Sequence, residues 1–478
     1  MVFLWLFLVL LIAFLAVVIT RAARFTPTES AVEAGEEIPV DEGRLVSHLQ
    51  AMLRLKTVSH HDGALTDPAP FQAFRDLLKQ FYPLVFSRCE YELAGKNGIL
   101  LRLPGKSREK PSVLMAHYDV VPASEALWAR PPFSGDLIDG EVWGRGAIDT
   151  KCTLLSILEA AEDLLSHGFV PENDVYFSFG GDEEVMGQDA SAIVDLLESR
   201  GVRPAFVLDE GGAVVDKVFP GVKKSAALIG IAEKGSAFFD VKASGKSGHA
   251  SAPPAKQAVA VLAKALLSLS RHPAPFTLTK PALDLFDTLG RHSTFIYKII
   301  FANLWCFRPV LDLICKKSGG ELNALVRSTD ALTRLSASES YNVLPNEAAA
   351  GLNVRLIPGD SIKKTEQRLS KTINDKAVSL RFVRGSEPST VSLTDGEPWD
   401  RLNQAILQTY PGVIVSPYLM IAASDSRHFC RISDHVYRFS GFPLTAGQRK
   451  MIHSQDERIP RSLLPQGYRF FYRVLKKC

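Results

Sequence analysis

Apolar runs of strand length alternate with stretches of helical periodicity along most of this chain, and this alternation constrains the fold more than any other feature. After residue 40, strands are expected at 112–115, 175–179 and 205–208, and helices at 41–55, 152–165 and 188–199. Strands that are joined by helices form a parallel sheet with helices on its faces. We therefore predict an α/β domain with a mostly parallel sheet, whose active side chains gather at the carboxyl ends of the strands.

The pattern changes near residue 236, where a second group of elements begins. Strands are expected at 238–241, 349–356 and 378–383, and helices at 258–270 and 361–374. This order is typical of a split βαβ sheet. We predict an α+β lid domain of residues 236–385, inserted into a main domain that is made of residues 41–235 and 386–478.

Residues 1–20 contain no charged side chain and one polar side chain, Thr20. Twenty apolar residues are long enough to cross a bilayer core of about 30 Å as a helix. A cleaved signal peptide usually has a basic start and a shorter apolar run, of about 7–15 residues. Residues 1–24 are therefore predicted to form a hydrophobic helix that stays as a membrane anchor, with cleavage as a signal segment at Ala22 and Ala23 as the alternative, followed by a linker at 25–40.

The orientation in the membrane depends on two opposing tendencies. Arg21 and Arg24 follow the apolar segment, and such basic residues favour the cytoplasmic side. The stretch that follows is acidic, and large domains cross membranes largely regardless of flanking charge. We expect a single-pass anchored or secreted protein with an extracytoplasmic main domain.

Composition excludes several other classes of protein. Hydrophobic residues make up 46% and charged residues 22% of the chain, which is typical of a folded protein. The net charge of +3, from 55 basic and 52 acidic residues, excludes the concentrated basic surface of a nucleic-acid binder. The six cysteines include no C-x-x-C pair, so neither a disulfide scaffold nor a thiolate zinc site is indicated.

A second strongly apolar segment, residues 295–315, carries Lys298, Arg308 and Asp312. Three charges argue against another membrane span. The segment predicts either a pair of hydrophobic helices beside an apolar substrate or an ordinary part of the core.

Acids and histidines follow apolar runs at five places in the sequence: His117–Asp119, Asp149, Gly180–Glu184, Asp209–Glu210 and His453. Each has an ordinary explanation by itself, such as a hydrogen-bonded histidine, a helix cap or a solvated turn. Four of them, however, lie at consecutive strand ends of one predicted sheet. They offer nitrogen and oxygen ligands without thiolates, which favours a catalytic zinc, cobalt or manganese centre over a structural zinc site.

Seven motifs, in their order along the chain, resemble the co-catalytic dizinc aminoacylases and carboxypeptidases: AHYDVVP, WGRGAID, GDEE, LDEGG, SGHAS, YNVLPNEA and IHSQDERI. The resemblance covers nearly the whole chain after residue 40. Within that family, the stretch 272–340 and the phrases FANLWCFRP, SDSRH and VLDEGGAVV are most similar to the branch of carboxypeptidase S and the N-fatty-acyl-amino-acid synthase/hydrolase.

The resemblance implies two Zn²⁺ ions, with Co²⁺ or Mn²⁺ as alternatives. It implies that His117 and Asp209 bind one ion, that Glu184 and His453 bind the other, and that Asp149 bridges the two. No ligand implied by the family is missing from this sequence.

The family's other functional positions also have counterparts here. By resemblance, Glu183 is the general base and Asp119 supports the first metal histidine. His249, in the lid, polarises the scissile carbonyl or stabilises the oxyanion. Asn342 and Arg355 match lid positions that contact substrate, and Arg355 suits a substrate carboxylate because its guanidinium can grip it with two hydrogen bonds.

The predicted activity is hydrolysis of the amide bond in N-acyl amino acids, with N-fatty-acyl amino acids favoured by the two apolar segments, and with synthesis by reversal of the same reaction. A carboxypeptidase or dipeptidase is the alternative enzyme. A membrane receptor for acyl ligands is the alternative outside enzymes, and it predicts a lost base or ligand. A nucleophilic serine hydrolase is disfavoured because the chain has no G-x-S-x-G motif. A homodimer formed through the lid is a further expectation.

Overall fold

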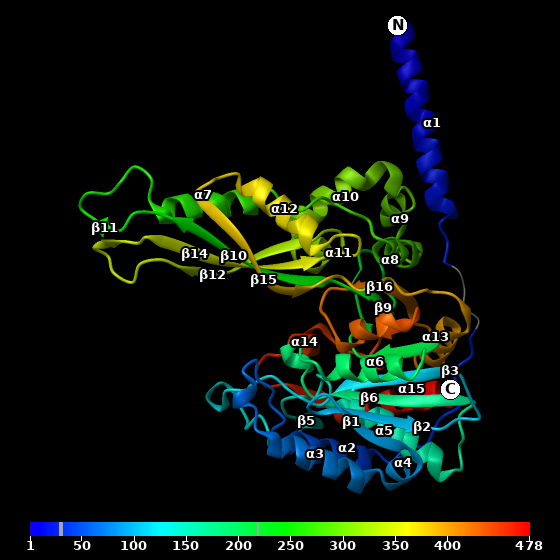
Figure 1. The fold of residues 1–478 in the computed structure, drawn as a ribbon. Coiled ribbons are helices and arrows are strands. Elements are labelled where there is room, and N and C mark those ends of the chain that lie inside the picture. The colour runs from blue at the N-terminus through cyan, green and yellow to red at the C-terminus, as the bar shows by residue number, and fades with distance from the viewer. Residues whose placement is uncertain (28–31, 218) are drawn as a thin grey trace.

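The computed structural model describes residues 1–27, 32–217 and 219–478, so that residues 28–31 of the predicted linker lie outside the described residues. The main domain is built on one twisted sheet (Figure 1). Its strands lie in the spatial order β1 (Glu90–Ala94), β2 (Gly98–Leu103), β6 (Asn173–Gly180), β3 (Ser107–His117), β7 (Phe206–Asp209), β17 (Val436–Arg438), β9 (Ala226–Glu233) and β16 (Ile414–Met420), with β8 (Val214–Val215) paired to β9.

The centre of this sheet is parallel. Strands β6, β3, β7 and β17 run in one direction, so the ends of β6, β3 and β7 meet at one edge of the sheet. Strand β2 is antiparallel both to β6 and to its hairpin partner β1, and β9 pairs antiparallel with β17 but parallel with β16. This arrangement confirms the predicted α/β fold.

Helices cover both faces of the main sheet. One face carries α2 (Glu42–Arg54), α3 (Pro68–Phe81), α4 (Pro83–Arg88), α5 (Lys151–Ser166), α13 (Gly396–Thr409) and α15 (Leu464–Leu475), and the other carries α6 (Asp189–Ser199). The predicted helices 41–55, 152–165 and 188–199 thus correspond to α2, α5 and α6. Smaller elements complete the domain: β4 (Leu137–Ile138), β5 (Glu141–Trp143), α14 (Ala446–Arg449) and β18 (Arg458–Pro460).

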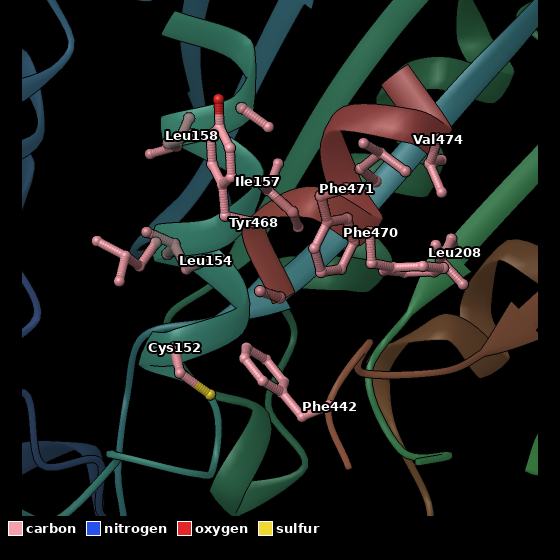
Figure 2. Close-up of a cluster of buried hydrophobic side chains, with 14 of the residues drawn as sticks. Cys152, Leu154, Ile157, Leu158, Leu208, Phe442, Tyr468, Phe470, Phe471 and Val474 are labelled. Atoms are coloured by element: carbon pink, nitrogen blue, oxygen red, sulfur yellow. The ribbon is translucent and has the colours of Figure 1, made fainter. Parts of the chain in front are cut away.

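The largest core cluster lies between α5, α15 and the sheet. Figure 2 shows apolar side chains of the two helices meeting above Leu208 of β7. Gly467 of α15 allows this close packing because it has no side chain: a Cβ there would lie 2.9 Å from Ser156 Oγ of α5 and 2.3 Å from the ring of Phe442. The position of α5 matters for function because its N-terminus presents Asp149 to the strand ends.

A second, four-stranded sheet forms the lid. Its order is β12 (Thr329–Ser336), β14 (Glu347–Leu356), β10 (Gly235–Ser244) and β15 (Val378–Ser386), with all neighbours antiparallel. Helices α7 (Ala258–Arg271) and α12 (Ile362–Ile373) pack on one face. This is the predicted split βαβ arrangement. A short antiparallel pair of strands, β11 (Gly248–His249) and β13 (Val343–Leu344), forms the outer end of the lid (Figure 1).

Four helices within the predicted lid range pack on the main domain instead of the lid sheet: α8 (Lys280–Arg291), α9 (Phe295–Phe301), α10 (Leu304–Ser318) and α11 (Gly320–Leu325). The apolar stripe of α8, which includes Leu285 and Leu289, is buried beside Phe219 and Ile414. The physical reason is the open edge of the sheet at β16, which α8 covers. The lid proper is therefore smaller than residues 236–385.

The N-terminal part of helix α1 (Val2–Arg24) projects from the molecule, and its C-terminal part contacts α9 (Figure 1). Within the described residues it is the one helix that is long and apolar enough to cross a membrane. Most of its side chains are exposed, and only Val18 and Ala22 are buried. The segment 295–315 forms the two helices α9 and α10, which agrees with the predicted helix pair.

Candidate metal centre

Two histidines and two carboxylates meet where the central strands end. His117 is the last residue of β3, Asp149 directly precedes the N-terminal turn of α5, Glu184 follows β6 and His453 lies in the loop before β18. Asp149 lies between the histidines, with one oxygen 3.0 Å from His117 Nε2 and the other 3.0 Å from His453 Nε2. Glu184 Oε2 lies 2.8 Å from His453 Nε2. Asp149 therefore has the position of a carboxylate shared by two sites.

The structure places Glu210, and not the predicted Asp209, beside His117. Glu210 Oε1 lies 3.3 Å from His117 Nε2. Asp209 points the other way, where its two oxygens accept hydrogen bonds from the backbone amides of Glu210 at 2.9 Å and Ser426 at 3.0 Å. Successive side chains at the end of a strand point to opposite sides, so only one of two adjacent acids can face the site. Asp209 instead holds the chain in place behind it.

Asp119 connects the histidine to the acidic loop after β6. His117 Nδ1 lies 3.0 Å from the backbone carbonyl oxygen of Asp119 and 3.3 Å from its Oδ1. The two carboxylate oxygens accept hydrogen bonds from the backbone amides of Glu183 and Glu184 at 3.2 and 3.1 Å. The Ser59 hydroxyl donates a further hydrogen bond of 2.6 Å. A carboxylate on the second ring nitrogen fixes the tautomer and orientation of a ligand histidine. This geometry suits the predicted supporting role.

The three consecutive acids after β6 have different surroundings. Asp182 accepts hydrogen bonds from the backbone amides of Gln188 and Asp189, at the N-terminus of α6. Glu183 and Glu184 face the cluster. Burial raises the pKa of the Glu183 carboxyl well above its ordinary range, with His117 opposing this and the carboxylate of Asp425 adding to it. A carboxylate in such surroundings is suited to accept and hold a proton.

The carboxylates of the cluster favour a cation beside them. Hydrogen bonds with Asp149 and Glu184 raise the pKa of His453 to about 10, so these carboxylates strongly favour a cation between them. Glu184 Oε1 is buried and has no hydrogen-bond partner among the described residues. Two overlapping groups place one ligand atom per residue within 4.8 Å of one another: His117, Asp149 and Glu184, and His117, Glu183 and Glu210. The donor set of imidazole and carboxylate groups fits divalent cations such as zinc.

Glu457 is fully buried behind Asp149 and was not among the predicted site residues. Its carboxylate accepts hydrogen bonds from the backbone amides of Gly146, Ile148 and Asp149 at 3.0, 2.8 and 3.1 Å, and pairs with Arg145 at 2.9 Å. Glu457 thereby fixes the loop that carries Asp149. The signal was present in the IHSQDERI motif, where this acid follows the metal histidine.

The structure does not bring the three predicted lid residues to the metal cluster. His249 and Asn342 lie at the outer end of the lid, around β11 and β13, away from the main domain (Figure 1). Both are exposed, and His249 Nδ1 lies 2.8 Å from the Ser251 hydroxyl. Arg355 lies at the base of the lid on β14, opposite Ser236. Burial lowers the pKa of its guanidinium, and no carboxylate among the described residues offsets this.

A cavity of about 480 Å³ adjoins the cluster. Asp149, Glu183, Glu210 and His453 line one end. The rest of its wall is mostly apolar. It includes Leu285 and Leu289 of α8, Leu322 and Leu325 of α11, and also Phe219 and Met420. Arg449 also lines this cavity, and its Nε is buried without a hydrogen-bond partner among the described residues. Cavities of this size with a few convergent polar groups are typical of small-molecule sites.

Together, the α/β fold and a clustered imidazole–carboxylate site that includes a glutamate of raised pKa are typical of a metal-dependent hydrolase. The chain belongs to peptidase family M20/M25/M40, whose model matches residues 113–477. The family is one of metal-dependent peptidases, so the protein acts on peptide or amide bonds.

Individual relatives agree with this assignment. The chain is 34% identical to probable carboxypeptidase S-like 2 of Dictyostelium discoideum, over 98% of this chain and 92% of that protein. It is 35% identical to the N-fatty-acyl-amino acid synthase/hydrolase PM20D1 of Xenopus tropicalis, over 91% and 85%. The M20 family metallo-carboxypeptidase Sso-CP2 of Sulfolobus solfataricus has the same fold, with a TM-score of 0.66 at 17% identity over 91% of this chain and 99% of that one. The resemblance that the motifs suggested is confirmed.

Proposed function

We propose that this protein hydrolyses the amide bond of N-acyl amino acids with long aliphatic acyl chains, and that the same site supports the reverse synthesis. The observation that carries this proposal is the apolar cavity that begins at Asp149, Glu183 and Glu210. A peptide substrate would place polar amide groups against this wall, and burying an unpaired amide is costly. An aliphatic chain has no such groups. The similarity to a protein described as an N-fatty-acyl-amino acid synthase/hydrolase supports the same substrate class.

The metal ligands that we propose are His117 and Glu210 for one ion, Glu184 and His453 for the other, and Asp149 for both. Two Zn²⁺ ions are our proposal, with Co²⁺ or Mn²⁺ as alternatives. Divalent cations held there would polarise the scissile carbonyl and acidify water.

Glu183 moves the protons in this proposal. Its carboxylate takes a proton from the attacking water and returns it to the leaving nitrogen. Asp119 keeps Glu183 in place through the backbone hydrogen bond described above. Arg355 orients the substrate by binding the free carboxylate of the amino acid.

The proposal is tested by offering the purified full-length protein N-oleoyl-phenylalanine and a plain dipeptide, with bound metal measured in the same sample. We expect cleavage of the acyl amino acid. Cleavage of the dipeptide alone would support a carboxypeptidase or dipeptidase instead. Metal-free protein that binds oleoyl-phenylalanine without turnover would support the receptor.

Enlarging a side chain in the cavity is expected to shorten the acyl chain that the enzyme accepts. Leu322 lines the cavity and is half-buried. Leu322→Trp should lower kcat/KM for an N-oleoyl amino acid by at least about tenfold, since even one methylene in an apolar pocket is worth roughly 10–200-fold. An N-butanoyl amino acid should be cleaved as before. Leu322→Met, which conserves volume, is the matched control, and equal losses on both substrates would contradict this role for the cavity.

Arg355→Ala is expected to raise KM for N-acyl amino acids with little change in kcat, since it removes a carboxylate contact that the ground state and the transition state share. The corresponding amides, which lack the free carboxylate, should be cleaved as before. Arg449→Ala is the informative comparison because Arg449 lines the cavity. If the carboxylate-specific loss appears in the Arg449 variant and not in the Arg355 variant, Arg449 is the partner.

His249 and Asn342 take part in this proposal only when the outer end of a lid reaches a metal centre. That requires either a large lid movement or the lid of a second copy. We propose a homodimer through the lid, with His249 stabilising the oxyanion.

We further propose that α1 anchors the protein in a membrane and that the main domain is extracytoplasmic. Supporting this, α1 has 23 residues, and its apolar side chains are largely exposed in the molecule. Exposed apolar surface on this scale is covered by lipid in membrane proteins.

A further inference from the structure

Helix α10 carries apolar side chains on its exposed surface as well as on its buried side. Leu311 and Cys315 are buried against the main domain. Four other apolar side chains of α10 are exposed, and the preceding helix α9 adds two more; the exposed set is Phe295, Ile296, Trp305, Val310, Leu313 and Ile314. We call these six residues the α9–α10 patch. Ile296 is 71% exposed and Trp305 57%. A surface helix of a water-soluble protein normally has a polar outer side, so the patch needs a partner.

The patch lies directly beside the base of α1 (Figure 1). Arg21 donates hydrogen bonds to the carbonyl of Ala302, at the end of α9, at 3.1 and 3.2 Å. The fully buried amide of Asn303 donates a hydrogen bond of 3.0 Å to the carbonyl of Val18. These contacts fix the position of the two helices relative to α1.

A contact between Trp305 and α1 indicates how deep the patch would lie in a bilayer that α1 spans. The ring of Trp305 packs edge-on against that of Phe14, with the ring centres 5.9 Å apart. Phe14 lies six residues before Thr20, which corresponds to about 9 Å along a helix at 1.5 Å per residue. When residues 1–20 span a bilayer, Trp305 therefore lies at the same depth as Phe14, about 9 Å from the Thr20 end of the span. Helices that lie in a membrane interface bury their apolar side by about 5–10 Å.

The charges around the patch suit a lipid surface. Residues 291–320 contain five basic side chains and one acid, Asp312. Asp312 is paired with Lys316 and Arg327. Arg308 and Lys317 are exposed, as is Arg24 at the end of α1. Basic residues next to a membrane helix attract anionic headgroups.

The patch and the cavity are two sides of one apolar layer. Leu285 and Leu289 line the cavity and belong to the same buried cluster as Phe301 of α9 and Leu311 of α10. A substrate with a long acyl chain partitions into the bilayer, which on this geometry lies one layer of helices away from the cavity.

We propose that the α9–α10 patch docks into the surface of the bilayer that α1 spans, so that the protein is held against the membrane by two elements instead of one. The occupant of the patch is lipid with anionic headgroups at its rim. This proposal rests on the membrane anchor proposed above and adds a second, independent contact with lipid.

The test uses the full-length chain in nanodiscs of phosphatidylcholine and phosphatidylserine whose acyl chains are brominated near the headgroup, because bromine quenches tryptophan that touches it. Trp5 of α1 reports on the anchor, and Trp305 reports on the patch. Trp5→Phe with Trp305→Phe gives the background of the other three tryptophans. The emission of Trp5→Phe above this background is that of Trp305, and the emission of Trp305→Phe above it is that of Trp5. We expect brominated lipid to quench the Trp305 emission. Leu313→Asp should reduce this quenching, whereas Leu335→Asp, on the exposed lid strand β12, should not.

The possible outcomes separate the two proposals. Quenching of Trp5 without quenching of Trp305 would overturn docking of the patch and leave the anchor in place. Trp305 that is protected from aqueous iodide but not quenched by lipid would mean that a second copy or another protein covers the patch, which also overturns the proposal. Quenching of Trp305 without that of Trp5 would support docking and overturn the spanning anchor. Quenching of neither would overturn both.

Discussion

Glu183→Gln is expected to abolish most turnover while leaving the metal content unchanged. The carboxylate is buried in the cluster, and glutamine keeps its shape but cannot take up a proton. General bases contribute about 10²–10⁴-fold to the rate, so kcat should fall by roughly that factor with little change in KM. Turnover of N-oleoyl-phenylalanine and metal content are measured on the same preparation.

Glu183→Asp provides the control for this prediction. Aspartate retains the carboxylate but is shorter, so it should recover part of the activity if proton transfer is what the glutamine variant lacks. Near-normal turnover by Glu183→Gln would remove Glu183 as the base. Loss of metal from that variant would instead indicate that Glu183 is a ligand, in line with its place in one of the two ligand groups.

Glu210→Gln and Asp209→Asn, on neighbouring residues, are expected to give opposite results. Loss of even an indirect partner of a metal ligand costs about 10–100-fold in metal affinity, so loss of the Glu210 carboxylate should cost at least that, together with most of the activity. Asp209→Asn should keep the metal. It should lower the free energy of unfolding by about 1–3 kcal/mol, because one of two buried backbone amides loses its acceptor.

Metal analysis and thermal unfolding of both variants distinguish these roles. Full metal occupancy in Glu210→Gln, combined with metal loss in Asp209→Asn, would restore Asp209 as the ligand. The adjacent positions make each variant the matched control of the other.

Which of the adjacent acids Asp209 and Glu210 faces the cluster could not be predicted from the sequence. The end of an apolar strand followed by LDEGG predicts that an acid faces the site, but two acids are adjacent and their side chains point in opposite directions. Which of them faces the site depends on where strand β7 meets its neighbours. Asp209 is turned away from the site, where its carboxylate accepts a hydrogen bond from the backbone amide of Ser426 in a distant segment.

The fold was more accessible to sequence reasoning than the arrangement of its parts. The helices α2, α5 and α6 and the central strands have regular periodicity, and their order implies the parallel sheet. The packing of α8 on β16 could not be derived in this way, because an apolar stripe shows that a helix is buried but not against which surface. For the same reason, the motif that contains His249 gave no indication that the residue lies at the outer end of the lid.

The cluster around Asp149 is completed by residues near the end of the chain. Asp149 is held by a residue 308 positions later in the chain, and His453 completes the same cluster. A growing chain on the ribosome therefore contains most of the main sheet long before it has a complete metal centre. With the proposed ligands, the metal centre can be completed only when nearly the whole chain has emerged, and a chain that ends before residue 453 lacks both the histidine and the buried carboxylate.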